Sequence, residues 1–249
     1  MPIRTLIVTG ASRGIGAAVA LKAGLSGYRV AVNYRSDEAA AKQVVQQICD
    51  AGGTAIPVRA DIADEAGVIG LFNEAEDSLG PIYGLVNNAG ITGGFARLDE
   101  TTRSMLERLM AVNVIGPIMC LREAVRRMST RYGYSGGSIV NISSLAARTG
   151  GAGEWVHYAA TKGAINTLTI GLSREVANEG IRVNAVSPGL IETDLHAAAG
   201  APDRLARLSS GIPMKRPGTP GEIAAGVLWL LSNEASYVTG AILEIGGGR

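Results

Sequence analysis

Cysteine is scarce in this sequence. The 249 residues include only Cys49 and Cys120, and these form neither a CxxC pair nor any other metal-ligand spacing. The acidic stretch DIADEAG at 61–67 lacks the spacing of a calcium loop. We therefore expect no disulfide framework and no bound metal. We interpret both cysteines as ordinary helix or core residues of a cytoplasmic protein.

An excess of charge of one sign is also lacking. Lys and Arg total 23 against 22 Asp and Glu, and no Lys/Arg-rich run occurs. A nucleic acid is therefore not an expected partner, and a small molecule is the better hypothesis for a ligand.

Long hydrophobic runs are absent too. The chain opens MPIRTLIVTG, without the apolar core of a signal peptide, and no stretch approaches the ~18 apolar residues that cross a bilayer. No Pro/Ser-rich linker, charge run or solenoid repeat divides the chain. These absences predict a soluble, unprocessed protein, with no membrane partner, folded as a single domain over residues 1–249.

Short β-branched runs alternate with longer helical patterns along the chain. This βαβα order, with strands apolar on both faces, predicts an α/β fold: a Rossmann-type, doubly wound parallel sheet of about seven strands with helices on both faces. The expected strands are residues 5–9, 29–34, 54–60, 82–88, 137–143, 181–186 and 241–245. The expected helices lie near residues 14–25, 37–51, 64–79, 101–112, 114–131, 155–178 and 221–232.

A glycine-rich turn follows the first strand. Its sequence, TGASRGIG, contains Gly10, Gly14 and Gly16 in a G-x-x-x-G-x-G spacing. Such a turn between a strand and a helix lets the backbone approach a pyrophosphate, whose charge the helix N-terminus stabilises. Three glycines at a tight turn can also be purely structural. Their position after the first strand favours a nucleotide site.

Four further motifs occur in order. NNAG (87–90), NISS (141–144) and SPGLIET (187–193) follow strands at the sheet edge where open α/β sheets bind ligands. YAATK (158–162) places a tyrosine and a lysine on one helix face. Together with TGASRGIG, these motifs resemble the short-chain dehydrogenase/reductase family across nearly the whole chain. The resemblance is greatest to its 3-oxoacyl-carrier-protein reductase and sugar or polyol dehydrogenase members.

The family resemblance implies catalytic roles for four residues. Tyr158 would give its phenolic proton to a substrate carbonyl oxygen, or take it back in oxidation, with Lys162 and the oxidised nicotinamide lowering its pKa from ~10 toward neutrality. Ser144, preferred over Ser143, would hydrogen-bond the same oxygen. Asn113, which could instead be a polar break between two helices, would support a water-linked proton path.

The resemblance also implies NADP(H) as the cofactor. Relatives that prefer NAD carry an acid at the end of the second strand, where this chain has Tyr34 followed by Arg35. Arg13 could reach a 2′-phosphate from the glycine turn, although both arginines could be solvated. The expected cofactor-binding residues are Gly10, Ser12, Arg13, Gly14, Ile15, Gly16, Tyr34, Arg35, Asp61, Ile62, Asn88, Ala89, Gly90, Tyr158, Lys162, Pro188, Gly189, Ile191 and Thr193.

Several residues permit a second reading. Asp61 either contacts adenine, as in the family, or caps the helix expected at 64–79. His157 and His196 stand in no nucleophile-elbow context, so we expect structural or pocket-lining roles rather than a hydrolase triad. Trp155 and Trp229 are expected to pack or to line a pocket.

The sequence therefore predicts an NADPH-dependent oxidoreductase that reduces a carbonyl compound to an alcohol. The alternatives are a sugar or alcohol dehydrogenase acting mainly as an oxidant, and a non-catalytic dinucleotide sensor. We also expect a substrate lid at about 190–214 and, from the apolar faces of the helices near 114–131 and 155–178, a homotetramer.

Overall fold

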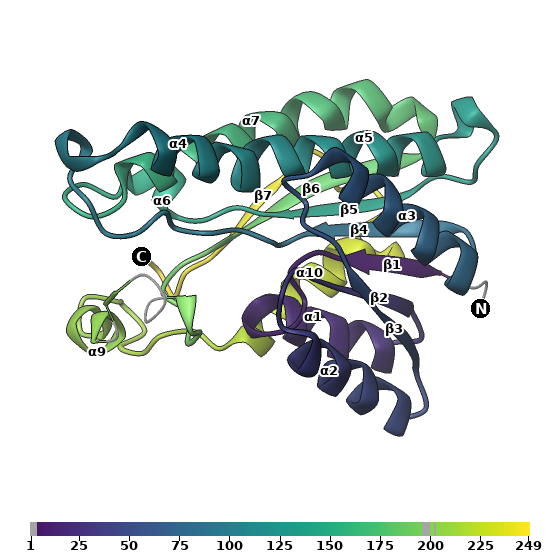
Figure 1. Ribbon diagram of the computed structural model, residues 1–249, viewed down its shortest axis with the longest axis horizontal. Helices are drawn as coiled ribbons and strands as arrows, with labels where there is room; N and C mark the ends of the chain where they lie inside the picture. Colours follow the sequence, from purple (N-terminus) through teal and green to yellow (C-terminus); the bar gives the residue numbers. More distant parts are fainter. Residues whose placement is uncertain (1–3, 196–199, 202) are drawn as a thin grey trace.

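The computed structural model describes residues 4–195, 200–201 and 203–249. Seven strands form a single parallel sheet in the order β3-β2-β1-β4-β5-β6-β7 (Figure 1). The predicted doubly wound α/β fold is confirmed. The strands are β1 (Thr5–Val8), β2 (Arg29–Tyr34), β3 (Thr54–Arg59), β4 (Ile82–Asn87), β5 (Gly137–Ile142), β6 (Ile181–Pro188) and β7 (Ile242–Ile245).

Helices cover both faces of this sheet, as Figure 1 shows. Side chains alternate across a strand, so Leu6 and Val8 of β1 enter one core and Ile7 enters the other. The first core packs against α1 (Gly14–Leu25), α2 (Glu38–Asp50) and α10 (Pro220–Leu231). The second packs against α3 (Glu65–Leu79), α5 (Gly116–Met128) and α7 (Val156–Val176).

Side-chain caps define where several helices begin. Asp37 accepts the backbone N–H of Ala40 at the start of α2, and Asp64 accepts that of Gly67 at the start of α3. The suggestion that Asp61 caps the 64–79 helix is therefore wrong. Asp64, three positions after Asp61, is the residue that caps this helix.

The two helices expected at 101–112 and 114–131 form one continuous run instead of two helices with a break. α4 (Arg103–Met110) passes through a π-helical turn, η2 (Ala111–Ile115), directly into α5. The run Arg103–Met128 is long and apolar enough to cross a membrane by length and composition, which corrects the expectation from the sequence. Core helices pass the same test, and α5 buries Cys120, Leu121 and Ala124 against the sheet.

The segment between β6 and α10 is less irregular than expected, because it contains the short helix α9 (Arg204–Ser209). A second short helix, α6 (Ala146–Thr149), follows β5. Neither has enough residues to display a helical period in the sequence. Four short 3₁₀ helices complete the helical elements of the described residues: η1 (Leu98–Glu100), η3 (Thr130–Tyr132), η4 (Ala177–Glu179) and η5 (Asn233–Ala235).

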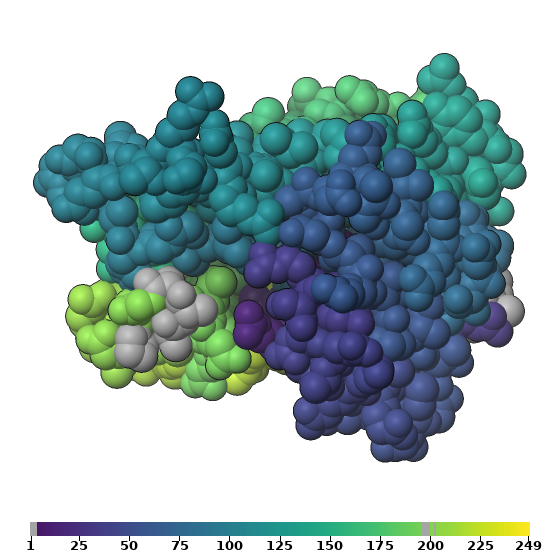
Figure 2. Space-filling model, in the orientation of Figure 1, coloured from purple at the N-terminus to yellow at the C-terminus, as the bar shows by residue number. Residues whose placement is uncertain are grey.

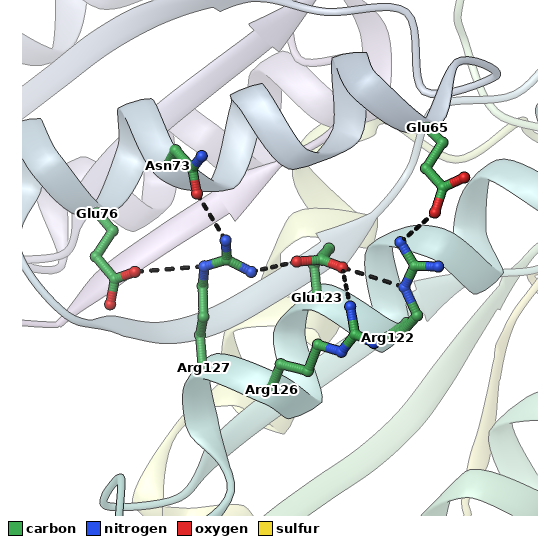
Figure 3. A network of polar contacts seen from close by, with 7 residues as sticks. All are labelled: Glu65, Asn73, Glu76, Arg122, Glu123, Arg126 and Arg127. Atoms are coloured by element: carbon green, nitrogen blue, oxygen red, sulfur yellow. Dashed lines mark hydrogen bonds and ion pairs between the residues drawn. The ribbon is translucent and has the colours of Figure 1, made fainter. Parts of the chain in front are cut away.

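A buried carboxylate ties α5 to α3 (Figure 3). Glu123, with 4% of its side chain exposed, accepts hydrogen bonds from Arg122, Arg126 and Arg127. Arg127 continues to Glu76 on α3 (3.3 Å). Burial alone would raise the pKa of the Glu123 carboxyl, but the surrounding guanidiniums hold this pKa below its usual value. The carboxylate therefore stays ionised and links two helices of one sheet face.

Candidate active site

The glycine turn joins β1 to α1 through close backbone contacts. Gly10 and Gly14 both have positive φ, +60° and +58°. A Cβ at Gly10 would lie 2.9 Å from Ala89 Cα, and one at Gly16 would lie 2.4 Å from the Gly10 carbonyl oxygen. Larger residues at these positions would force the backbone apart. The turn leaves the first N–H groups of α1 facing a cavity at the carboxyl ends of the strands.

That cavity has a volume of about 900 Å³ and runs from the glycine turn to the first two turns of α7. In Figure 2 the yellow-green C-terminal segment and the purple N-terminal residues lie on opposite sides of a recess below the teal helices. Its lining includes most of the residues predicted to bind a dinucleotide, namely Gly10, Ser12, Arg13, Gly14, Ile15, Tyr34, Arg35, Asp61, Ile62, Asn88, Ala89, Gly90, Tyr158, Lys162, Pro188, Gly189, Ile191 and Thr193. Gly16, the remaining one, supports the turn from behind.

Three of the predicted catalytic side chains meet in this cavity. Ser144, just after β5, lines the cavity with Tyr158, and its side chain acts to lower the pKa of the phenol. Lys162 lies one turn along α7, with Nζ 5.6 Å from the centre of the Tyr158 ring. Ser143 points elsewhere, because its hydroxyl donates to the Lys162 carbonyl (3.2 Å). The second serine of the pair is therefore the one that faces the phenol.

Burial shapes the acidity of this group. It raises the pKa of Tyr158 to about 12, although the Ser144 side chain and the Arg204 charge act in the opposite direction. Burial also lowers the pKa of Lys162 to about 8, and its ammonium group donates to the Ile142 carbonyl (2.7 Å). The protein's own groups thus keep the phenol protonated, whereas the sequence suggested a pKa near neutrality with the cofactor's help.

Asn113 stands behind these residues, in the π-helical turn η2. Its amide bridges the chain after β4: Oδ1 accepts the Ile91 N–H (2.9 Å), and Nδ2 donates to the Ile91 carbonyl (2.8 Å) and to Thr161 (3.2 Å). A Cβ at Gly90 would lie 3.4 Å from Asn113 Oδ1 and 3.7 Å from Lys162 Nζ. The π turn therefore brings an otherwise helical asparagine close to the lysine.

The opposite end of the cavity carries mostly cationic side chains. Arg13 and Arg35 are exposed there, and Tyr34 is buried at the end of β2. Asp61 accepts the Ala63 N–H (3.0 Å) and pairs with Arg108 of α4 (3.1 Å). Burial would raise the pKa of Asp61, but these partners hold it below its ordinary value.

The histidines and tryptophans singled out in the sequence lie in different surroundings. His157 is buried and its Nε2 lies 3.2 Å from the Gly94 carbonyl oxygen, so it braces the loop after β4. His196 lies outside the described residues. Trp155 lines the cavity and contacts Tyr158 edge-on, whereas Trp229 is 40% exposed on α10.

Sequence reasoning missed much of the cavity beside Tyr158. The lining residues that no motif identified include Thr92, Gly93, Gly94, Glu154 and Arg249, which lie in loops, and Arg204 and Leu208, which lie on α9 inside the expected lid. It also missed Arg108, which lies in a helix with no other functional signal. Only the fold brings these positions together.

Known proteins resemble the whole chain. The family model described as enoyl-(acyl carrier protein) reductase matches residues 10–249. The oxidoreductase YgfF of Escherichia coli (strain K12) is 49% identical, covering 98% of each chain. Glucose 1-dehydrogenase 2 of Bacillus subtilis is 37% identical, covering 98% of this chain and 94% of the relative. The 3-oxoacyl-[acyl-carrier-protein] reductase FabG of Staphylococcus aureus is 36% identical, covering 98% and 97%.

A solved structure agrees with these relatives. A dehydrogenase/reductase from Sinorhizobium meliloti 1021 superimposes with a TM-score of 0.91 at 38% identity, over 98% of this chain and 94% of that one. Its fold and the family match confirm the resemblance predicted from the five motifs. The chain belongs to the short-chain dehydrogenase/reductase family, a family of oxidoreductases that use a nicotinamide dinucleotide.

Proposed function

We propose that this protein reduces a carbonyl compound to an alcohol, reversibly, and prefers NADPH. The observation that carries the proposal is the convergence of Ser144, Tyr158 and Lys162 in one cavity, with Lys162 Nζ 5.6 Å from the centre of the Tyr158 ring. The cofactor, when bound, supplies the hydride in reduction and accepts it in oxidation. A cavity of about 900 Å³ that begins at a helix N-terminus suits such a dinucleotide.

Each side chain has a defined task in this proposal. Tyr158 donates its phenolic proton to the substrate oxygen, and its raised pKa favours the protonated form that reduction requires. Ser144 donates a hydrogen bond to the same oxygen, where negative charge develops. Lys162 binds the ribose hydroxyls of the cofactor, and Asn113 holds the loop after β4 and supports a proton path to solvent.

The preference for NADPH rests on charge. Arg13 and Arg35 line the end of the cavity that would hold the adenosine, and a guanidinium bonds two phosphate oxygens at once. Asp37 lies nearby, but its carboxylate caps α2 by accepting the Ala40 N–H (3.0 Å). That acid is therefore already engaged with the helix. Tyr34 occupies the position where relatives that prefer NAD carry theirs.

The segment at 190–214 supplies the cover of the substrate end. Its described residues that line the cavity are Leu190, Ile191, Thr193, Asp194, Leu195, Arg204 and Leu208. Residues 196–199 and 202 of the expected lid lie outside the described residues. We propose that the described part closes over a bound substrate.

Assembly and compartment follow from two surface features. Met110, Ile115 and Ile170 expose 42%, 49% and 37% of their surfaces on neighbouring helices α4 to α7 (Figure 1), which supports burial of this face in a homotetramer. Cys49 and Cys120 are free thiols, which supports a reducing compartment such as the cytoplasm.

A substrate panel tests the function. Ketones, acyl thioesters and sugars should be assayed by NADPH absorbance, and the matching alcohols by its appearance from NADP⁺. We expect turnover of at least one carbonyl class. Faster oxidation than reduction at neutral pH would favour a dehydrogenase acting mainly as an oxidant. Cofactor binding without turnover of any class would favour the sensor.

A further inference from the structure

Arg204 occupies an unusual place for an arginine. Its side chain is only 9% exposed, and it is the one arginine in the part of the chain with described structure that counts as buried. It begins α9 and reaches the cavity wall beside Tyr158. Desolvation of a buried guanidinium destabilises the folded state unless partners compensate the charge, so the contacts of Arg204 need an explanation.

Glu154 and Trp155 hold this guanidinium, and the Phe95 ring lies farther away, with its centroid 6.0 Å from Arg204 Cζ. Glu154 accepts hydrogen bonds from Nη2 (2.7 Å) and Nε (3.2 Å) through a single oxygen. Arg204 Cζ lies over the Trp155 ring, 4.1 Å from the ring centroid, within the range of a cation–π contact. The residues that hold Arg204 therefore directly precede α7, which carries the catalytic tyrosine.

Trp155 transmits this contact to the active site. The Trp155 ring packs edge-on against the Tyr158 ring, with centroids 5.7 Å apart. It also makes a tilted contact with the Phe95 ring, with centroids 4.7 Å apart. The loop that carries Phe95 is also joined to this wall, because the Ala96 N–H donates to the Glu154 carbonyl (3.1 Å). Three segments far apart in the sequence thus meet at one guanidinium.

We infer that Arg204 is a positioning residue for the proposed reaction: it presses Trp155 against Tyr158 and places a positive charge beside the phenol. The inference rests on the proposed function of Tyr158 as the proton donor. Glu154 orients the guanidinium and partly neutralises it. This assigns a chemical role to α9, which no motif of the chain identifies.

The charged groups around Tyr158 come from several segments. Ser144 and the neighbouring His157, which faces Gly94, are joined there by Lys162 on α7, Glu154 before it, Asp194 after β6, Arg204 on α9 and Arg249 near the C-terminus. The other charged residues that line the cavity are Arg13, Arg35, Asp37, Asp61 and Arg108. Of these charged groups, Arg204 is the one whose charge lowers the pKa of Tyr158, against the larger effect of burial. Geometry and electrostatics therefore agree.

Opposite charge changes at the two partners separate this role from simple packing. Arg204→Gln should move the tyrosine-dependent limb of the pH–kcat profile upward by about half a pH unit or more, and Glu154→Gln should move it downward. Arg204→Lys keeps the charge and should restore the limb. Arg207→Gln is the matched control, because Arg207 bonds the same Glu154 (3.4 Å) but is 55% exposed. It should leave the limb in place.

The inference would be overturned if the tyrosine-dependent limb shifts in the same direction in Arg204→Gln and Glu154→Gln, or if it does not shift in Arg204→Gln. Fluorescence supplies a measurement without turnover. In a Trp229→Phe background Trp155 is the only tryptophan, and Arg204→Gln should change its emission while Arg207→Gln should not. Unchanged emission would equally contradict the inference. If the Tyr158→Phe variant keeps the full activity and the pH profile of the unmodified protein, the proposed function itself would be contradicted.

Discussion

The two ends of the cavity differ in the groups that form their walls. At the end proposed to hold the cofactor, asparagine side chains fix the backbone of the glycine turn: the Gly10 N–H donates to Asn33 Oδ1 (3.1 Å), and Asn88 Nδ2 donates to the carbonyls of Thr9 (2.9 Å) and Gly10 (3.0 Å). The substrate end consists of side chains from three separate segments, joined around Trp155 and Arg204.

This difference predicts where substitutions are tolerated. A backbone cradle requires glycine and asparagine at fixed spacings, because close approach and positive φ permit few other residues. A wall of side chains can be rebuilt by substitution at its loops while the scaffold stays intact. One fold can therefore keep one cofactor and accept many substrates.

The largest effect should come from the substrate end. Tyr158→Phe removes the proton and keeps the ring, so we expect kcat to fall by at least ~10² on an identified substrate. The dissociation constant of the cofactor, measured by fluorescence titration, should change little. Equal losses in both quantities would break the division between the two ends.

A substitution in the cradle should have the converse effect. Gly16→Ala places a Cβ 2.4 Å from the Gly10 carbonyl oxygen, so we expect the free energy of unfolding to fall by about 1–3 kcal/mol and cofactor binding to weaken. Gly70→Ala is the matched control. Gly70 is exposed on α3 with nothing within 4 Å of the added Cβ, and alanine there should stabilise by about 0.5–1 kcal/mol. Denaturant unfolding measures both changes.

The adenosine side of the cradle should respond to charge alone. Unmodified protein should favour NADPH over NADH by at least about tenfold in kcat/KM, and Tyr34→Asp with Arg35→Ala should reverse the order. The pH profile set by Tyr158 should not move. Equal use of both cofactors by the unmodified protein would remove Arg13 and Arg35 from the proposal.

The smallest effect concerns stability. The pKa of Lys162 is lowered by burial to about 8, against ~10.4 in an unfolded chain, so between pH 8 and 10 the unfolded state binds more protons. The contribution of this group to the free energy of unfolding therefore rises with pH in that window. Lys162→Met should abolish the rise and stabilise the protein at pH 7 by on the order of 1 kcal/mol, despite the lost bond to Ile142. Melting temperature against pH tests this; an unchanged slope would contradict it.

The sequence by itself determined the sheet, the glycine turn, and the Tyr158 and Lys162 pair. These depend on local rules: alternation along strands, positive φ at glycine, and the four-residue repeat of a helix face. It also indicated Ser144 over Ser143, which the direction of the Ser143 hydroxyl agrees with. The break expected near Asn113 was wrong, because the helix continues through a π turn into α5 even though Gly116 and Pro117 follow that turn directly.

Only the tertiary structure decided the substrate end. Phe95 follows β4, Trp155 directly precedes α7 and Arg204 begins α9, and their contact depends on how the strands before these segments are ordered in the sheet. The burial that raises the pKa of Tyr158 and lowers that of Lys162 likewise depends on the assembled wall. Residue type sets the chemistry a side chain can perform, but desolvation and the distances between charges exist only after the chain has folded.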